Sequence, residues 1–331
     1  MNKIGDQEKN WDVIIVGGGC AGLSAAIYLG RAMRTVLLID SGQSLALWEP
    51  DAQNYFGFPD GIAGQKLLEL GKAQAEKYES EFVKDEISEA THEGDQIVLQ
   101  GKKQKYHARR VLLATGLLHI PPDIPHVNEC LGHSMFFCKD CDGYRNQEKQ
   151  IVIVGHNDDA VEYALGMICY ASCVSIATNG IKPSWSKQHD DWVVEYKIPV
   201  YEARIVEVEQ ENGFIRSLMF ADEHRVAVEA LFTTRGDIVH NKLGKALGAE
   251  LDENGQIVVN HCMRTSVPGL YAAGCVTPAN CQMIIAAGNG ATAAQAINRD
   301  LFEESLRNHQ LRCFRAKQVQ TQQTEPAILS H

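Results

Sequence analysis

The chain has 331 residues, of which 45% are hydrophobic and 22% charged, a composition typical of globular proteins that leaves room for two domains. The formal net charge of −11 argues against a nucleic-acid or anionic-membrane partner, and no apolar run is long enough to span a bilayer. The polar stretch Met1 to Asn10 lacks the apolar core of a secretory signal. We therefore expect a cytoplasmic protein with mostly reduced cysteines.

A short β-branched run, 11–16, leads into a glycine-rich turn and then into an apolar helical pattern. In this arrangement Gly17 permits the tight turn, Gly19 admits a pyrophosphate, and Gly22 lets the helix pack closely on the strand. The next apolar run ends at Asp40, whose carboxylate can accept a hydrogen bond from a ribose 2′-hydroxyl. We predict a Rossmann-like site for FAD or NAD. The alternative is a structural glycine turn with a surface aspartate.

Four segments complete the first predicted domain. Residues 41–61 are rich in proline, glycine and aromatics and predict an ordered irregular loop, whereas 65–81 have helical spacing. Short strands are expected at 97–99 and 111–114. The prolines within 121–125 then break regular structure and indicate the exit from this domain.

Two cysteines, Cys138 and Cys141, are separated by two residues, and Asp142 follows directly. Such a pair can close a reversible disulfide, with a carboxyl group at hand for its opening. Half of a zinc site and a plain buried pair are the alternatives. No second pair has zinc-like spacing, and the other eight cysteines (20, 130, 169, 173, 262, 275, 281 and 313) are scattered, so we favour the redox interpretation.

The strand and turn pattern recurs at 150–154 and 155–160, which predicts a second dinucleotide-type fold in tandem. Its nucleotide site is degenerate. Asn157 stands where a glycine would admit a pyrophosphate, and after the next strand, 173–177, the residues 178–180 include neither an arginine for a 2′-phosphate nor an acid for a 2′-hydroxyl.

The rest of the chain predicts short strands, a long helix and a polar tail. The strands are expected at 205–208, 214–220, 226–232, 256–259 and 269–274. The helix is expected from Gln282 to about Leu306, and Gly288 and Gly290 suggest close approach to a ligand or to another helix. Residues 307–331 are glutamine-rich and are expected to be disordered.

Together these motifs resemble the low-molecular-weight thioredoxin reductase family of flavoproteins, up to about residue 306. The matching segments are Gly17-x-Gly19-x-x-Gly22, Ala114-Thr115-Gly116, Cys138-x-x-Cys141-Asp142-Gly143, 265–274, Gln282 and 286–288. The resemblance implies an α/β fold of two tandem Rossmann-like dinucleotide-binding domains, the second inserted in the first. Residues 1–118 and 246–331 would form an FAD-binding domain, and 119–245 an inserted NADPH-type domain that carries the cysteine pair.

The resemblance also implies roles for individual residues. Cys141 would face the flavin, Cys138 would exchange with the substrate, and Asp142 would act as acid or base. Cys275 stands where the family has an aspartate that contacts the flavin ribityl chain. The residues implied for FAD binding are Gly17, Gly19, Cys20, Ala21, Gly22, Asp40, Ser41, Asn54, Ala114, Thr115, Gly116, Gly274, Cys275, Gln282 and Met283.

The departures from the family concern NADPH. Members that use it carry a second glycine fingerprint, a His-Arg-Arg cluster and a Gly-His-x-Pro-Asn motif; here 155–160, 178–180 and 234–238 stand in their places. Each lost arginine removes charge-assisted bonds worth about 1.5–3 kcal/mol. We expect an FAD-dependent thiol-disulfide oxidoreductase that does not use NADPH, similar to ferredoxin-linked or diflavin-linked, nucleotide-independent relatives of the family.

The expected partners are a thioredoxin-like protein or a small disulfide, a ferredoxin or another one-electron donor, and a second copy in a homodimer. A second flavin in the vacated nucleotide pocket is an alternative electron source, and Trp185 and Trp192 could stack on it or simply pack in the core. Three other functions stay open: an NADPH-dependent thioredoxin reductase, an oxygen-using dithiol oxidase for a small molecule, and a non-catalytic flavoprotein. No metal is expected.

Overall fold

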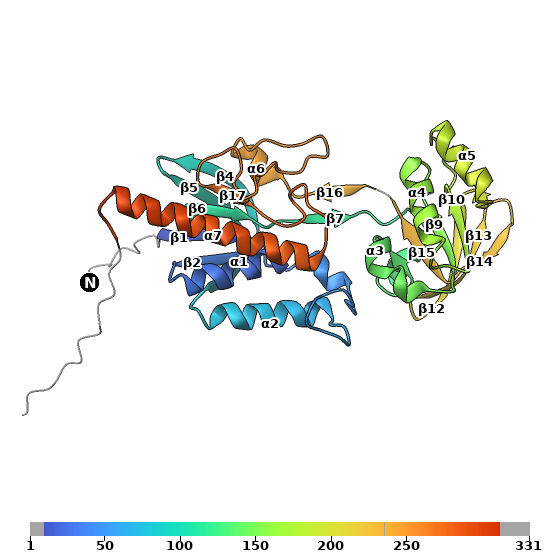
Figure 1. Cartoon of the computed structure of the whole chain (residues 1–331), viewed down its shortest axis with the longest axis horizontal. Helices are drawn as coiled ribbons and strands as arrows, with labels where there is room; N and C mark the ends of the chain where they lie inside the picture. Colours follow the sequence, from blue (N-terminus) through green and yellow to red (C-terminus); the bar gives the residue numbers. More distant parts are fainter. Residues whose placement is uncertain (1–9, 235, 312–331) are drawn as a thin grey trace, which may run out of the picture.

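The computed structural model describes residues 10–234 and 236–311 and shows two α/β units built from one chain (Figure 1). The beginning and the end of the described chain share one unit, and the middle forms the other. The strands β7 (Leu117–His119) and β16 (Asp237–Val239) pair antiparallel where the chain passes between the units. The predicted fold class, with one Rossmann-like unit inserted in the other, is confirmed. The bounds 1–118, 119–245 and 246–331 stay a proposal.

The first unit is built on a sheet of seven strands. In spatial order they are β3 (Glu81–Lys84), β2 (Val36–Asp40), β1 (Asn10–Val16), β6 (Lys105–Leu113), β5 (Gln96–Gly101) and β4 (Ile87–Glu93), with β17 (Leu270–Ala272) also paired to β6. Strands β1, β2, β3, β6 and β17 run parallel, so the ends of β1 and β2 meet at one edge, where dinucleotide sites form.

Helices α1 (Cys20–Arg31) and α7 (Met283–Arg307) pack side by side against this sheet, next to α2 (Gly64–Glu76) (Figure 1). The predicted long helix is thus confirmed, with Gln282 as its N-cap residue. A Cβ added at Gly290 would meet the backbone oxygen of Ala21 at 2.0 Å, whereas a Cβ at Gly288 would meet nothing within 4 Å. Close approach to another helix is therefore confirmed at Gly290; at Gly288 no other part of the described chain comes close, and approach to a ligand there stays a prediction.

This contrast gives a matched pair of variants in one helix. We expect Gly290→Ala to lower the free energy of unfolding by about 2 kcal/mol or more, because helices α1 and α7 must separate to admit the methyl group. Gly288→Ala should raise it by up to about 1 kcal/mol, since alanine favours the helix. Urea unfolding followed by circular dichroism measures both. Equal effects of the two changes would show that α7 does not pack on α1 as described.

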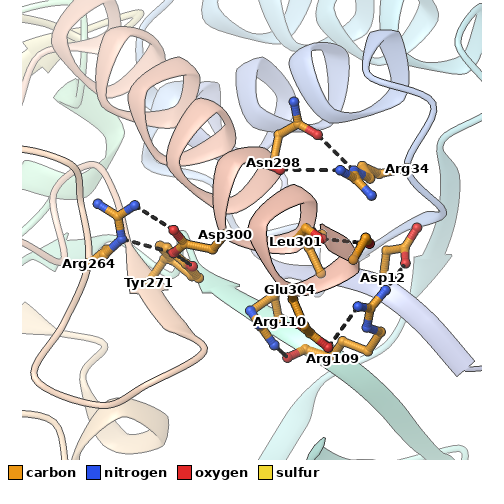
Figure 2. A network of polar contacts seen from close by, with 11 residues as sticks. Asp12, Arg34, Arg109, Arg110, Arg264, Tyr271, Asn298, Asp300, Leu301 and Glu304 are labelled. Atoms are coloured by element: carbon orange, nitrogen blue, oxygen red, sulfur yellow. Dashed lines mark hydrogen bonds and ion pairs between the residues drawn. The ribbon is translucent and has the colours of Figure 1, made fainter. Parts of the chain in front are cut away.

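Ion pairs fasten the C-terminal half of α7 to the sheet (Figure 2). Glu304 pairs with Arg109 at 2.9 Å and with Arg110 at 2.5 Å, and Arg109 also pairs with the buried Asp12 at 2.9 Å. Asp300 meanwhile receives two hydrogen bonds from Arg264. These contacts join β1, β6 and α7, and so hold the two ends of the described chain in one unit.

The middle unit has a five-stranded parallel sheet and a three-stranded antiparallel one. The parallel order is β11 (Val200–Tyr201), β10 (Cys173–Ala177), β9 (Gln150–Val154), β15 (Ala230–Thr233) and β8 (Met135–Phe136); the antiparallel order is β12 (Ile205–Glu211), β13 (Phe214–Phe220) and β14 (Arg225–Ala227). The helices of this unit are α3 (Lys139–Asp142), α4 (Asp158–Met167), α5 (Lys187–Glu195) and the short 3₁₀ segments Val127–Cys130 and Tyr144–Asn146. Helix α6 (Lys242–Ala246), beside β4, and the 3₁₀ segment Leu45–Trp48, beside α2, belong to the first unit (Figure 1).

Several predicted elements differ from the structure. The helix expected over 65–81 ends at Glu76, because the chain turns through Glu79 with φ of 61° before strand β3 begins. The strand expected at 226–232 is two strands in different sheets. The strand expected at 256–259 is reduced to an isolated bridge between Leu251 and Ile257.

The loop expected over 41–61 contains one 3₁₀ turn, Leu45–Trp48. Most of the tail expected to be disordered, 312–331, lies outside the described residues. Among the residues with described positions, no helix is long and apolar enough to cross a membrane.

Candidate active site

A cavity of about 600 Å³ lies at the edge of the first sheet where β1 and β2 end, and both units line it. It is lined by all three predicted catalytic residues, Cys138, Cys141 and Asp142. Every residue implied for FAD binding also lines it except Gly22, which packs beneath the turn. The fold thus gathers, from segments far apart in the chain, the set of side chains singled out in the sequence.

The glycine turn is held in shape by close packing and by Asp40. Gly17 has φ of 112°, and a Cβ there would meet the backbone oxygen of Ala114 at 2.2 Å. A Cβ at Gly22 would meet the oxygen of Gly17 at 1.9 Å, so the first turn of helix α1 can pack beneath the glycine turn only with glycine at this position. The carboxylate of Asp40 accepts hydrogen bonds from the backbone nitrogens of Gly18, at 2.9 Å, and Gly42, at 3.0 Å. Its remaining lone pairs are available to a ligand.

Cys138 and Cys141 form a disulfide at the start of the short helix α3. The sulfur of Cys138 also accepts a hydrogen bond from the backbone nitrogen of Cys141, at 3.1 Å. A donor aimed at sulfur stabilises the thiolate once the disulfide opens. The pairing favours the redox interpretation, because sulfurs joined to each other are not thiolate ligands for zinc.

Gln282 holds its side-chain amide against this disulfide. Its Nε2 donates to the sulfurs of Cys141, at 3.0 Å, and Cys138, at 3.3 Å, while its Oε1 accepts a hydrogen bond from Asn54 at 3.0 Å. Both residues were implied as flavin contacts. The structure places Gln282 against the sulfurs and Asn54 against Gln282, so that the first unit supplies a polar donor to the cysteine pair of the second.

Asp142 is buried beside the disulfide, and burial raises the pKa of its carboxyl group to about 7. Arg145, whose Nη2 lies 2.5 Å from the Asp142 carboxylate, lowers this pKa, and the negative charge of Glu49 raises it. Arg145 also reaches Glu49 of the first unit at 3.3 Å. Neither Arg145 nor Glu49 is among the site residues predicted from the sequence. Arg145 follows Asp142 at helical spacing, but no local pattern points to Glu49.

The structure contains a second disulfide, between Cys275 and Cys281. This corrects the view that the cysteines outside 138 and 141 are scattered, reduced thiols. The intervening segment bends at Pro278, and the two Cα atoms come within 5.0 Å. The sequence feature that could have predicted this disulfide is the pair Cys275 and Cys281 on either side of Pro278. Both cysteines line the same cavity as Cys138 and Cys141.

Cys20 also lines this cavity, and burial raises the pKa of its thiol to about 11. At neutral pH it therefore carries no negative charge. Because a protonated thiol is a poor nucleophile, we do not expect Cys20 to attack either of the disulfides that line this cavity.

In the second unit, the protein's own chain covers the turn that corresponds to the glycine turn of the first. Asn157 is the N-cap residue of helix α4, whose first turn carries Asp158 and Asp159. The backbone nitrogen of Ser186 donates to the carboxylate of Asp158 at 2.6 Å, and that of Ser184 donates to the oxygen of His156 at 2.7 Å. An anion at this helix start would thus meet the carboxylates of Asp158 and Asp159.

A smaller cavity of about 310 Å³ lies between the connecting strands and helices α3 and α4. Its lining residues are His119, Phe137, Lys139, Asp159, Glu162, Tyr163, Thr233, Thr234 and Asp237. Neither predicted stacking tryptophan lines it: Trp185 donates to Asp190, and Trp192 meets the ring of His189 edge-on.

The chain was compared with known proteins, and the model of the pyridine nucleotide-disulphide oxidoreductase family matches residues 11–298. The chain belongs to this family. It is a flavin-dependent disulfide oxidoreductase with a thioredoxin reductase-like fold.

Three relatives illustrate the likeness. Thioredoxin reductase of Bacillus subtilis (strain 168) is 30% identical over 305 residues, which are 88% of this chain and 95% of that one. The crystal structure of HlmI has a TM-score of 0.86 at 30% identity and covers 91% of this chain and 95% of its own. The structure of thioredoxin reductase from Streptococcus pyogenes MGAS5005, at 24% identity, shares the fold with a TM-score of 0.84, covering 89% and 99%.

Proposed function

We propose that this protein is an FAD-dependent thiol-disulfide oxidoreductase of the thioredoxin reductase type that exchanges electrons between the flavin and Cys138–Cys141 and does not draw them from NADPH. One observation carries the proposal: a disulfide lines the same cavity as a dinucleotide-binding turn. The names of the relatives, which are thioredoxin reductases, support it.

The cavity fits FAD. Its volume of about 600 Å³ lies within the range of about 300–1,000 Å³ usual for cofactor sites. Gly19 lines the cavity, and a Cβ there would meet only the hydroxyl of Ser44, at 3.3 Å, so the backbone stays open to a ligand; Asp40 stands where an acceptor for a ribose hydroxyl is needed. When bound there, the flavin would supply two-electron chemistry next to the disulfide. Gly17, Gly19, Asp40 and Gly274 are the residues we expect to hold it.

The two cysteines have different roles. We assign to Cys138 the exchange with the substrate disulfide, because the Cys141 amide donates to its sulfur and so favours its thiolate. Cys141 then faces the flavin. Gln282 acts as a positioning residue that directs its amide at both sulfurs.

Asp142 is suited to hold the proton that a departing thiolate requires. A carboxyl group with a pKa of about 7 is half protonated at neutral pH, and its buried Oδ1 lies against Arg145. In the direction that reduces an external disulfide, we expect it to donate this proton.

The pH dependence of turnover tests this role. Because the pKa is raised, the proton is present below pH 7 and absent above it, so the rate of disulfide reduction should fall as pH rises through about 7. Asp142→Asn should lower the rate by about 10²-fold and remove this ionisation from the pH profile. An unchanged limb near pH 7 in the variant would assign the ionisation to another group. Asp140→Asn is the control, since Asp140 is an exposed neighbour that pairs with Lys139.

Four features support independence from NADPH. The turn of the second unit lies under Ser184 and Ser186, and the start of helix α4 is acidic. After β10, Asn179 uses its side chain to bond the backbone of Asp123 and of Ile205. Arg204 lies beside Gly180, but its guanidinium pairs with Asp123 at 3.4 Å.

The electron donor in this proposal is a ferredoxin or another one-electron protein. A second flavin is the other candidate. The smaller cavity, of about 310 Å³, has about half the volume of the first, so it has room for a flavin ring but not for a whole FAD molecule. The proposal includes a thioredoxin-like protein or a small disulfide as substrate, a homodimer and a cytoplasmic location. An NADPH-dependent thioredoxin reductase is the main rival.

Binding of NADPH tests the donor assignment directly. We expect isothermal titration calorimetry to show no binding up to about 1 mM NADPH, a loss of at least two decades of affinity, since two arginines are missing. Thioredoxin reductase of Bacillus subtilis serves as the positive control. Micromolar binding to this protein would overturn the assignment.

A further inference from the structure

We propose that Cys275–Cys281 is a second redox-active disulfide, which exchanges electrons with Cys138–Cys141 inside the flavin cavity. The inference goes beyond the proposed function and does not depend on which donor reduces the flavin.

The two disulfides share one cavity and are joined through a single residue. All four cysteines line the cavity, and none of them is fully buried. Gln282 follows Cys281 in the chain, and its amide nitrogen lies 3.0 Å and 3.3 Å from the sulfurs of the other pair. The Cα of Cys281 is therefore no farther from the sulfur of Cys141 than one Cα–Cα step of roughly 3.8 Å, the length of the Gln282 side chain and the hydrogen bond of 3.0 Å together.

The loop closed by Cys275–Cys281 is already fixed without it. Thr277 donates from its backbone nitrogen and from its hydroxyl to the oxygen of Gly274, at 2.9 Å and 2.7 Å. The side chain of Gln256 donates to the oxygen of Thr277 at 2.9 Å. A structural staple would be redundant here, because these bonds set the same turn.

Pairing is also selective among the described cysteines. Five of them are free, including the exposed Cys169 and Cys173, which lie four residues apart. Disulfides thus occur only where the described cysteines border the flavin cavity. This distribution indicates a redox role and does not indicate a general oxidised state of the chain.

The exchange is balanced within the protein. The Cys138 thiolate attacks one sulfur of Cys275–Cys281, so that a mixed disulfide forms and the other sulfur leaves as a thiolate and takes up a proton. Cys141 then attacks Cys138, which re-forms Cys138–Cys141 and releases the second thiol. Two electrons and two protons pass from the first pair to the second. Gln282 must swing aside for the sulfurs to meet.

The test maps thiols in the flavin-loaded protein after limiting anaerobic reduction with dithionite, by acid quench, alkylation and peptide mass spectrometry. We expect label at Cys275 and Cys281 as well as at Cys138 and Cys141. In a Cys138→Ser/Cys141→Ser variant the flavin should still bleach, while Cys275–Cys281 stays oxidised. The free Cys262 reports that alkylation is complete.

Two outcomes would overturn the inference: a second pair that stays oxidised in the wild-type protein, or one that is reduced equally in the variant. A Cys141→Ser variant adds a second readout, because Cys138 then lacks its resolving thiol. A peptide that joins Cys138 to Cys275 or Cys281 is expected, and a crosslink to Cys20 instead would count against the exchange.

Discussion

A Cys138→Ser variant should retain its flavin and lose turnover of a disulfide substrate by about 10³-fold or more. Serine has nearly the shape of cysteine, so the cavity and its lining are preserved. It cannot form the mixed disulfide through which the exchange must pass. Flavin released per chain and the rate of disulfide reduction are the two measurements.

Cys169→Ser is the matched control, because Cys169 is a free and exposed thiol on the second unit. It should leave both flavin content and rate unchanged. Full activity in Cys138→Ser would contradict the proposed mechanism. Loss of flavin from it would show that Cys138 supports the cofactor and would leave its exchange role to Cys141.

Gly17→Ala should cost at least tenfold in flavin affinity, about 1.4 kcal/mol. A methyl group at this position would lie 2.2 Å from the oxygen of Ala114, and φ of 112° is unfavourable for alanine. The oxygen belongs to the backbone, where β6 ends beside β1, and cannot move without parting the strands.

Gly57→Ala is the control that separates the cost of a positive φ from the cost of a steric collision. Gly57 has φ of 99° with nothing within 4 Å, and it does not line the cavity. We expect it to lose stability but to keep its flavin. Fluorescence titration of the apoprotein with FAD measures both variants, and equal affinities would refute the placement of the cofactor at the first glycine turn.

The fold was readable from the sequence where local patterns are strong. The strand from residue 11, the glycine turn and the helix expected through Tyr28 form as expected, with the helix running on to Arg31, and so do β9, β10 and α7. Predictions failed where tertiary contacts decide. The break between β14 and β15 is an example. The backbone nitrogen of Glu229 donates to the oxygen of Gln150, and the backbone nitrogen of Gln150 donates to the Glu229 carboxylate, so the second half of that run joins the parallel sheet.

The sequence predicts the residues of the site but not the side chains that they contact. Cys138, Cys141 and Asp142 can be predicted from their spacing in the sequence. The contact between Glu49 and Arg145 cannot, because it forms only when the two units pack together. Gln282 could be implied as a flavin contact, yet its bond to the disulfide depends on the same meeting. The second disulfide was missed because a five-residue gap between cysteines is compatible with many conformations and only the turn at Pro278 closes it.

In the proposed function, the second turn, 155–160, is the part of the chain that argues against NADPH. Its sequence showed the lost glycine and the lost arginines. The structure adds that Ser184 and Ser186 lie over the turn and that acidic side chains begin helix α4. These contacts are a second observation, independent of the sequence motifs, that supports the proposed independence from NADPH.

The most direct test is an anaerobic titration of the purified flavoprotein, with flavin absorbance followed as NADPH, NADH and then dithionite or a reduced ferredoxin are added. Flavin released by denaturation is counted per chain beforehand. We predict that both nicotinamides leave the spectrum unchanged and that the one-electron donor bleaches it. Bleaching by one equivalent of NADPH would contradict the account and restore a nicotinamide-dependent thioredoxin reductase.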